Sequence, residues 1–100
     1  MNDYILFMHG DARSDADTDN AQAWELYLEA LRASGQFSGG SAIGSGACYA
    51  QSGAAKDLTS HLTDYLRVRA ESLDDARRFL VGNPVFEAGG TVEIRELPRG

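Results

Sequence analysis

The fold of this chain is decided by its last third, which reads YLRVRAE at positions 65–71, SLDDARRFLVGNP at 72–84 and TVEIREL at 91–97. The first segment lies in a stretch, 62–70, where apolar and polar residues alternate, which is typical of a half-buried strand. Ser72 is a preferred helix N-cap, and Gly82 and Pro84 are residues that end helices. The third segment alternates again. The last third therefore predicts a strand, a capped helix and a second strand, with these helix residues buried: Leu73, Ala76, Phe79 and Leu80.

The first third predicts a strand followed by a helix. Positions 4–8 (YILFM) are apolar throughout, which indicates a strand buried on both faces and therefore central in a sheet. A helix is expected at roughly 20–34, with Asp19 as N-cap and Gln22 three residues later in a capping-box arrangement. Its expected core face comprises Trp24, Tyr27, Leu28 and Leu31, at helical spacing.

The middle of the chain is rich in glycine and serine. We expect a strand near 37–41, a weaker strand near 47–50, a loop over 51–60, and a connection buried at 85–86. The complete order is βαββαβ in a single domain over residues 1–100. This order predicts an α+β ferredoxin-like fold, an antiparallel sheet with both helices on one face. A second copy packing sheet to sheet would cover the open face and form a homodimeric α+β barrel.

Composition limits the classes of partner. The net charge of −6 argues against nucleic acid and against an anionic membrane surface. No apolar run is long enough to span a membrane, and the apolar run after Asp3 lacks the basic start of a signal peptide. The single cysteine, Cys48, excludes an internal disulfide. We therefore expect a cytoplasmic protein without a cofactor.

His9 and Asp11 are candidate catalytic residues at the end of the first strand. A carboxylate beside an imidazole orients it and stabilises its protonated form, as in a general acid–base pair. In the plainer interpretation, which we favour, His9 packs at the sheet edge and Asp11 bonds to loop amides.

A second group of candidates lies on the polar face of the strand at 62–70. Tyr65, Arg67 and Arg69 point the same way by the period of two, and His61 continues this face. Guanidinium groups suit carboxylate and phosphate, so a small anionic or aromatic ligand is one possible partner, with Tyr49 as a further contact. Ion pairs within or between subunits, for example with Glu93, are the preferred alternative.

No metal site is expected. The segment 15–20 (DADTDN) imitates the start of a calcium-binding loop, but Asn20 replaces the turn glycine and Leu26 stands where a glutamate is needed. Cys48 lacks a partner at zinc-site spacing.

The chain resembles the YCII-related family, in its DGPF branch. The resemblance rests on MHGD at 8–11, LRASG at 31–35, SLDDA at 72–76 and GGTVEIR at 89–95. It implies a dimeric α+β barrel with a cleft on the sheet side, and some relatives are lyases or dehydrochlorinases of small ring compounds that use an acid–histidine dyad. The Asp-Gly-Pro-Phe turn is missing at 51–57, and Trp24 stands about where relatives carry a histidine in the first helix.

Two functions of different class follow. In the first, the chain is a homodimeric small-molecule-binding or accessory protein with a cleft lined by Tyr65, Arg67, His9 and Tyr49. In the second, it is a cofactor-independent, lyase-like enzyme in which His9 is the acid/base and Asp11 orients it. A purely structural dimer is a third possibility.

Overall fold

The computed structural model describes residues 1–12 and 21–99. The calcium-loop segment and the expected N-cap at Asp19 lie outside the described residues. The described elements are β1 (Asn2–His9), α2 (Ala21–Ala33), β2 (Phe37–Ala42), β3 (Leu62–Ala70), α3 (Leu73–Ala76), the 3₁₀ helix η1 (Arg77–Leu80), α4 (Pro84–Glu87) and β4 (Val92–Leu97).

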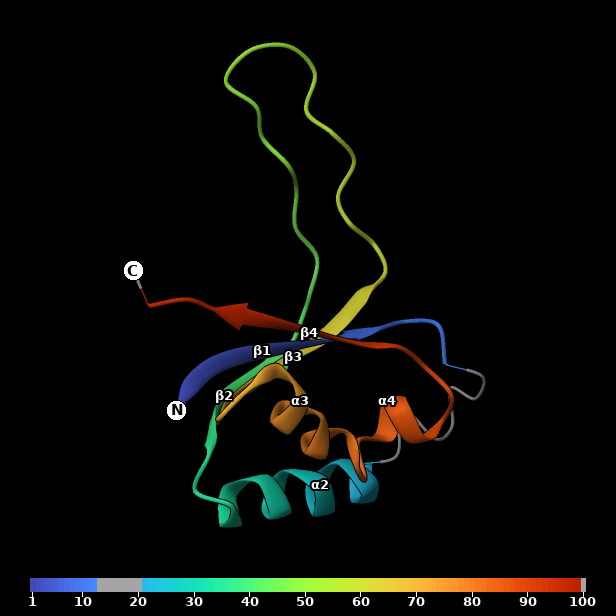
Figure 1. The fold of residues 1–100 in the computed structure, drawn as a ribbon. Coiled ribbons are helices and arrows are strands. Elements are labelled where there is room, and N and C mark those ends of the chain that lie inside the picture. The colour runs from blue at the N-terminus through green and yellow to red at the C-terminus, as the bar shows by residue number, and fades with distance from the viewer. Residues whose placement is uncertain (13–20, 100) are drawn as a thin grey trace.

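The four strands form one antiparallel sheet in the order β2-β3-β1-β4. The helices lie together on one side of this sheet (Figure 1). The ferredoxin-like prediction is thereby confirmed, and β1, apolar at every position from 4 to 8, is one of the two central strands.

Alternation along the central strands separates the two faces of the sheet. In β1, Tyr4, Leu6 and Met8 are buried against the helices, while the residues between them are half-buried on the other side. In β3, Leu66 and Val68 are buried on the helix side, as the period of two predicted. We call the side away from the helices the open face.

Helix α2 packs on the sheet through Tyr27 and Leu31, which are 5% and 3% exposed. Full burial of a side chain such as Leu31 contributes about 1.5–3 kcal/mol relative to leaving it exposed. The Tyr27 hydroxyl donates to the Phe79 carbonyl at 2.5 Å, which ties α2 to η1. Burial raises the pKa of Tyr27 above its ordinary value.

The second predicted helix is formed as two short elements, and a third short helix follows it where a connection was expected. Ser72 is the N-cap of α3, and its Oγ accepts a hydrogen bond from the Asp75 amide at 3.0 Å. The chain then tightens into η1 and turns at Gly82, where φ is +82°. Asn83 starts α4 by accepting hydrogen bonds from the amides of Val85 and Phe86, so the expected connection at 85–86 is helical. Val85 is buried as expected, but Phe86 is 43% exposed. Leu73, expected to be buried, is 54% exposed because α3 ends after one turn.

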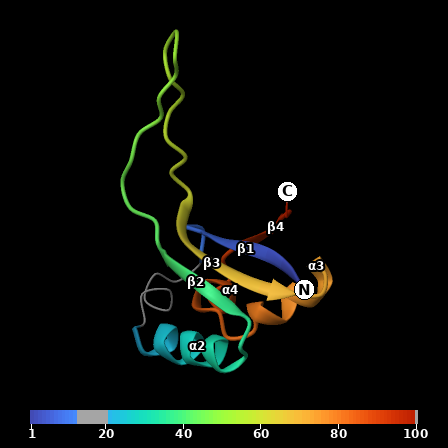
Figure 2. The same cartoon turned by 90° about the vertical axis from the view of Figure 1, so that its left-hand side faces the viewer.

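The expected weak strand at 47–50 is not formed. Residues 43–61, which we call the arm, contain no helix or strand and extend as two limbs from the β2–β3 end of the sheet (Figures 1 and 2). Every residue of the arm is exposed, so its small side chains have no apolar layer against which a sheet could be stabilised. Among the described residues, no helix is long and apolar enough to cross a membrane.

Candidate functional site

The open face carries a row of polar side chains around an apolar centre. Ile5 of β1 lies opposite Arg67 of β3 and Arg95 of β4, and Phe7 lies opposite Tyr65 and Glu93. On strands β1, β3 and β4, this face presents three arginines and two carboxylates, in a chain whose net charge is −6. These residues are Asp3, Arg67, Arg69, Glu93 and Arg95.

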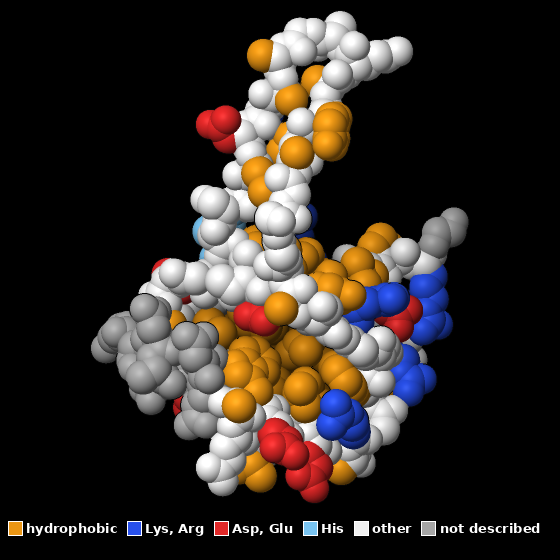
Figure 3. All heavy atoms as spheres, turned by 180° about the vertical axis from the view of Figure 1, so that it is seen from behind, with side chains coloured by type: hydrophobic (Ala, Val, Ile, Leu, Met, Phe, Trp, Pro, Cys, Tyr) orange, Lys and Arg blue, Asp and Glu red, His pale blue; other side chains and the backbone are white. Residues whose placement is uncertain are grey.

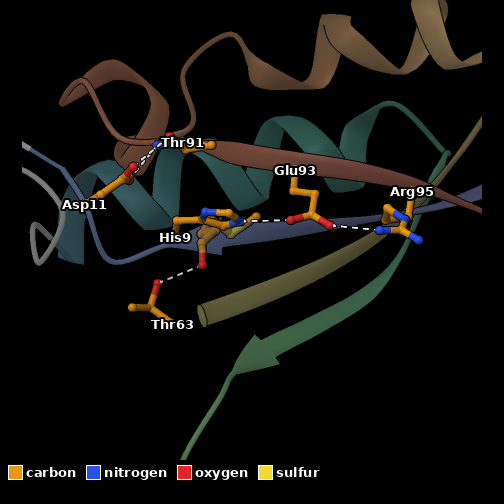
Figure 4. A network of polar contacts seen from close by, with 7 residues as sticks. His9, Asp11, Thr63, Thr91, Glu93 and Arg95 are labelled. Atoms are coloured by element: carbon orange, nitrogen blue, oxygen red, sulfur yellow. Dashed lines mark hydrogen bonds and ion pairs between the residues drawn. The ribbon is translucent and has the colours of Figure 1, made fainter. Parts of the chain in front are cut away.

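His9 lies at the end of β1, where a register irregularity after Met8 shifts its pairing with β3. Its Nε2 is 3.0 Å from Oε1 of Glu93, whose other oxygen accepts from Nη1 of Arg95 at 3.2 Å (Figure 4). The hydrogen bond with His9, followed by that from Arg95, lowers the pKa of Glu93. The carboxylate that orients the imidazole is therefore Glu93, 84 residues away in the sequence.

Asp11 is directed away from the imidazole. Its Oδ1 accepts from the Thr91 amide at 2.8 Å and its Oδ2 from the Thr91 hydroxyl at 2.7 Å (Figure 4). The Thr91 hydroxyl, followed by its amide, lowers the pKa of Asp11. Within residues 1–12 and 21–99, no hydrogen bond joins Asp11 to His9, so the expected dyad is not assembled here.

The two arginines of β3 differ in their surroundings. Arg69 donates from Nη2 to the Gly35 carbonyl at 2.7 Å. The Arg67 side chain has no hydrogen bond or ion pair to any described residue, and Glu93, its expected carboxylate partner, is engaged with His9 and Arg95. The pKa of Asp3 on the same face is lowered chiefly by its hydrogen bond from Arg99, and further by the charges of Arg99, Arg67 and Arg69. Arg67 thus retains a guanidinium that can receive an anion.

The remaining predicted residues lie at or beyond the edge of the open face. The ring of His61 meets that of His9 edge-on, with centroids 4.8 Å apart. Tyr49 lies in the arm and is 92% exposed, so the structure does not bring it together with the β3 residues.

A cavity of about 370 Å³ lies on the other side, between α2 and the β2 edge of the sheet. Figure 3 shows hydrophobic side chains gathered in this region, below the arm. Tyr65 is the predicted site residue that lines it. The apolar walls are formed by Trp24, Leu28, Phe37, Ala42 and Leu66.

Glycine in β2 creates this cavity. A Cβ on Gly40 would lie 2.5 Å from the Tyr65 carbonyl oxygen and 2.7 Å from the Leu66 side chain, so no larger residue fits there without a shift. Because β2 lacks side chains at this point, Trp24 is left half-buried against an open space. Trp24, expected on the core face of its helix, does pack against the core and in addition lines this cavity together with Gly39 and Gly40.

Two opposite charges complete the lining. Arg32 comes from the last turn of α2, and Asp64 from the helix side of β3. Neither side chain has a hydrogen bond or ion pair to another described residue, although the Arg32 backbone carbonyl accepts from the Gly35 amide at 3.2 Å. The cavity therefore offers both a cation and an anion to a ligand. The described part of the chain contains no group of three or more metal-ligating side chains.

No protein-family model and no curated protein sequence matches the chain. A solved structure does: 5-chloro-2-hydroxyhydroquinone dehydrochlorinase (TftG) from Burkholderia phenoliruptrix, in complex with 2,5-dihydroxybenzoquinone. The match has a TM-score of 0.59 and 23% identity, and covers 98% of this chain and 95% of that chain. At this identity, the likeness shows a shared fold.

Proposed function

We propose that this chain binds a small, planar, polar-substituted molecule in the cavity between α2 and β2. The observation that carries the proposal is the combination of aromatic walls with Arg32 and Asp64, whose side chains have no ion-pair partner within residues 1–12 and 21–99. A volume of about 370 Å³ lies within the range of small-molecule sites, which are mostly apolar with a few polar groups that fix orientation.

The neighbour of like fold supports the class of ligand. Its structure holds 2,5-dihydroxybenzoquinone, a flat ring with oxygen substituents. A ring of this kind would stack on Trp24 or Phe37, while Arg32 would bind an ionised oxygen and Asp64 would accept from a hydroxyl. The YCII-related resemblance points to the same class.

The chain contains a built-in reporter, because Trp24 is its single tryptophan. Titration with 2,5-dihydroxybenzoquinone or a hydroxybenzoate is expected to quench the fluorescence of Trp24 and to raise the melting temperature. Arg32→Ala should weaken binding of the anionic probe by about tenfold or more, since charge-assisted hydrogen bonds contribute about 1.5–3 kcal/mol.

Arg77→Ala is the matched control, because Arg77 is an exposed arginine on the neighbouring short helix that pairs with Asp74. If the native chain and both variants bind the anionic probe with equal affinity, the probe does not bind at Arg32 and the proposed site is wrong.

We also propose that the chain is a homodimer that buries its open face. The chain exposes 6701 Å², whereas a monomer of 10.8 kDa typically exposes about 5,500 Å². The surplus of roughly 1,200 Å², to which the exposed arm contributes, exceeds the ~800 Å² that each partner buries in a standard interface, so the chain as a whole has surface available for a partner. Half-buried Ile5 and Phe7 would form its apolar centre. Sedimentation velocity tests this, and a lone 10.8 kDa particle at all concentrations would refute it.

A lyase-like activity is the second candidate, and the His9–Glu93 hydrogen bond of 3.0 Å favours it. In this proposal the imidazole of His9 transfers the proton, and Glu93 orients the imidazole. Chloride release from a chlorinated hydroquinone is the assay. His9→Gln should lower the rate by about 10²–10⁴-fold, the usual contribution of a general acid–base. Glu93→Gln should lower it less, and Asp11→Asn should change it least. A native chain without turnover would remove this candidate.

A further inference from the structure

The side chains of the arm are not buried by the rest of the described chain. All of its residues are exposed, including large apolar ones: Ile43 at 37%, Tyr49 at 92% and Leu58 at 45%. A long segment without secondary structure in a small domain is usually functional or disordered. Apolar side chains held in water along such a segment indicate a surface that another molecule covers.

The two limbs of the arm lie side by side. At the base, the Ile43 amide donates to the Thr63 carbonyl at 2.9 Å. Further out, Sγ of Cys48 lies 3.6 Å from the Asp57 carbonyl oxygen. Tyr49 follows Cys48 and so belongs to the outer part of the arm, beyond this contact.

The direction of the arm indicates which molecule would contact it. In both ribbon views the arm rises on the side of the sheet opposite the helices, which is the side of the open face (Figures 1 and 2). A second copy seated on the open face would therefore lie alongside the arm.

The arm and the open face are chemically complementary. The open face is rich in guanidinium donors, and the Arg67 side chain has no hydrogen bond or ion pair to a described residue. Two such faces pressed together directly would bring three arginines but only two carboxylates from each copy into one interface. The arm carries Lys56, Asp57 and His61, and it also offers hydroxyls, the Gln51 amide and backbone carbonyls that accept hydrogen bonds. Arg69 already binds a carbonyl of this kind, that of Gly35.

We infer that the arm of each copy crosses onto the open face of a second copy and places Tyr49 beside the partner's Arg67 and the partner's Tyr65. The inference rests on the homodimer proposed above. The contact is two-fold symmetric, so each copy both gives and receives an arm. The polar row on the open face of each copy would then be completed by Tyr49 from the other subunit.

A disulfide between arm and face tests the crossing. The native chain has one cysteine, Cys48, which is exposed next to Tyr49. In Arg67→Cys, mild oxidation is expected to yield a covalent dimer on a non-reducing gel. The native chain gives the background of Cys48–Cys48 links, Arg67→Cys combined with Cys48→Ser gives the background of links between the two introduced cysteines, and Leu26→Cys, on the exposed side of α2, is the control for random collision. An intrachain link, or no more dimer than in these controls, would overturn the crossing.

Sedimentation of arm variants provides a second test. Tyr49→Ser with Leu58→Ser is expected to weaken the dimer by about tenfold or more, since aromatic anchors dominate interfaces. These side chains touch little in a single copy, so an unchanged circular dichroism spectrum shows that the fold persists. Leu26→Ser, at a leucine of α2 that is 61% exposed compared with 45% for Leu58, should leave the dimer intact. A native dimer that the arm variant does not weaken would overturn the crossing, but not the dimer or ligand binding at Trp24.

Discussion

Asp11 accepts both of its hydrogen bonds from Thr91 and so fastens the end of β1 to the start of β4. His9, two residues earlier, is hydrogen-bonded to Glu93 on the same neighbouring strand. The sequence placed His9 and Asp11 together at this strand end. It could not show which carboxylate reaches the ring, because that depends on the register of β4 and on the irregularity after Met8.

The hydrogen bonds of Asp11 predict a pH-dependent stability. The folded-state pKa of Asp11 is depressed, so its contribution is present above the unfolded pKa and is lost as pH falls through the folded value. Asp11→Asn should therefore be less stable than the native chain at pH 7. The difference should shrink as the pH falls below about 4, the ordinary range of the group. Urea unfolding at pH 7 and pH 3 measures it, with Asp74→Asn as an exposed control.

At the scale of elements, the strands were more predictable than the helices that follow them. The strand at 62–70 was predicted with its observed bounds, because alternation over nine residues fits no other element. The second helix was predicted as continuous up to Gly82, but it changes from α-helix to 3₁₀ helix after Ala76, and the separate helix α4 that follows the Asn83 cap was not predicted. Trp24 shared a face with core residues, and only the glycines of β2, distant in sequence, decide that this face meets a cavity.

The backbone of Gly40 lies close to β3, whereas Gly44 has open space around it, so alanine substitutions at these two glycines form a matched pair. Gly40→Ala would force a Cβ against the Tyr65 carbonyl and should destabilise the fold by about 1–3 kcal/mol, the usual range for overpacking. It should also narrow the cavity and weaken ligand binding. At Gly44, nothing lies within 4 Å of the added Cβ, so Gly44→Ala should be neutral or stabilising by about 0.4–1 kcal/mol. Chemical denaturation of both variants measures the difference, and equal stability would contradict the predicted clash.

At the scale of the whole molecule, the chain is more extended than its length requires. The radius of gyration is 14.9 Å, compared with about 13 Å for a typical domain of 100 residues. The fold class was predictable from the order of elements. The arm was not, because glycine and serine at 39–46 suit a short hairpin equally well, and only the loss of sheet pairing beyond Ala42 distinguishes the two.

A dimer whose folding is coupled to association should melt at a temperature that depends on concentration. We expect the melting temperature of the native chain to rise over a hundredfold increase in protein concentration, because mass action favours the associated folded state. The Tyr49→Ser, Leu58→Ser variant should lose part of this dependence, since its association is weaker. Differential scanning calorimetry measures both, and a constant native melting temperature would contradict the coupling.

The strand order has a consequence for how the chain could be divided. A cut in the arm would separate β1, α2 and β2 from β3, the short helices and β4. In the order β2-β3-β1-β4, every pairing then joins a strand of one fragment to a strand of the other. Neither fragment can build any of this sheet alone, so the two should remain unfolded apart and regain the native fold when mixed, which suits the chain to fragment complementation.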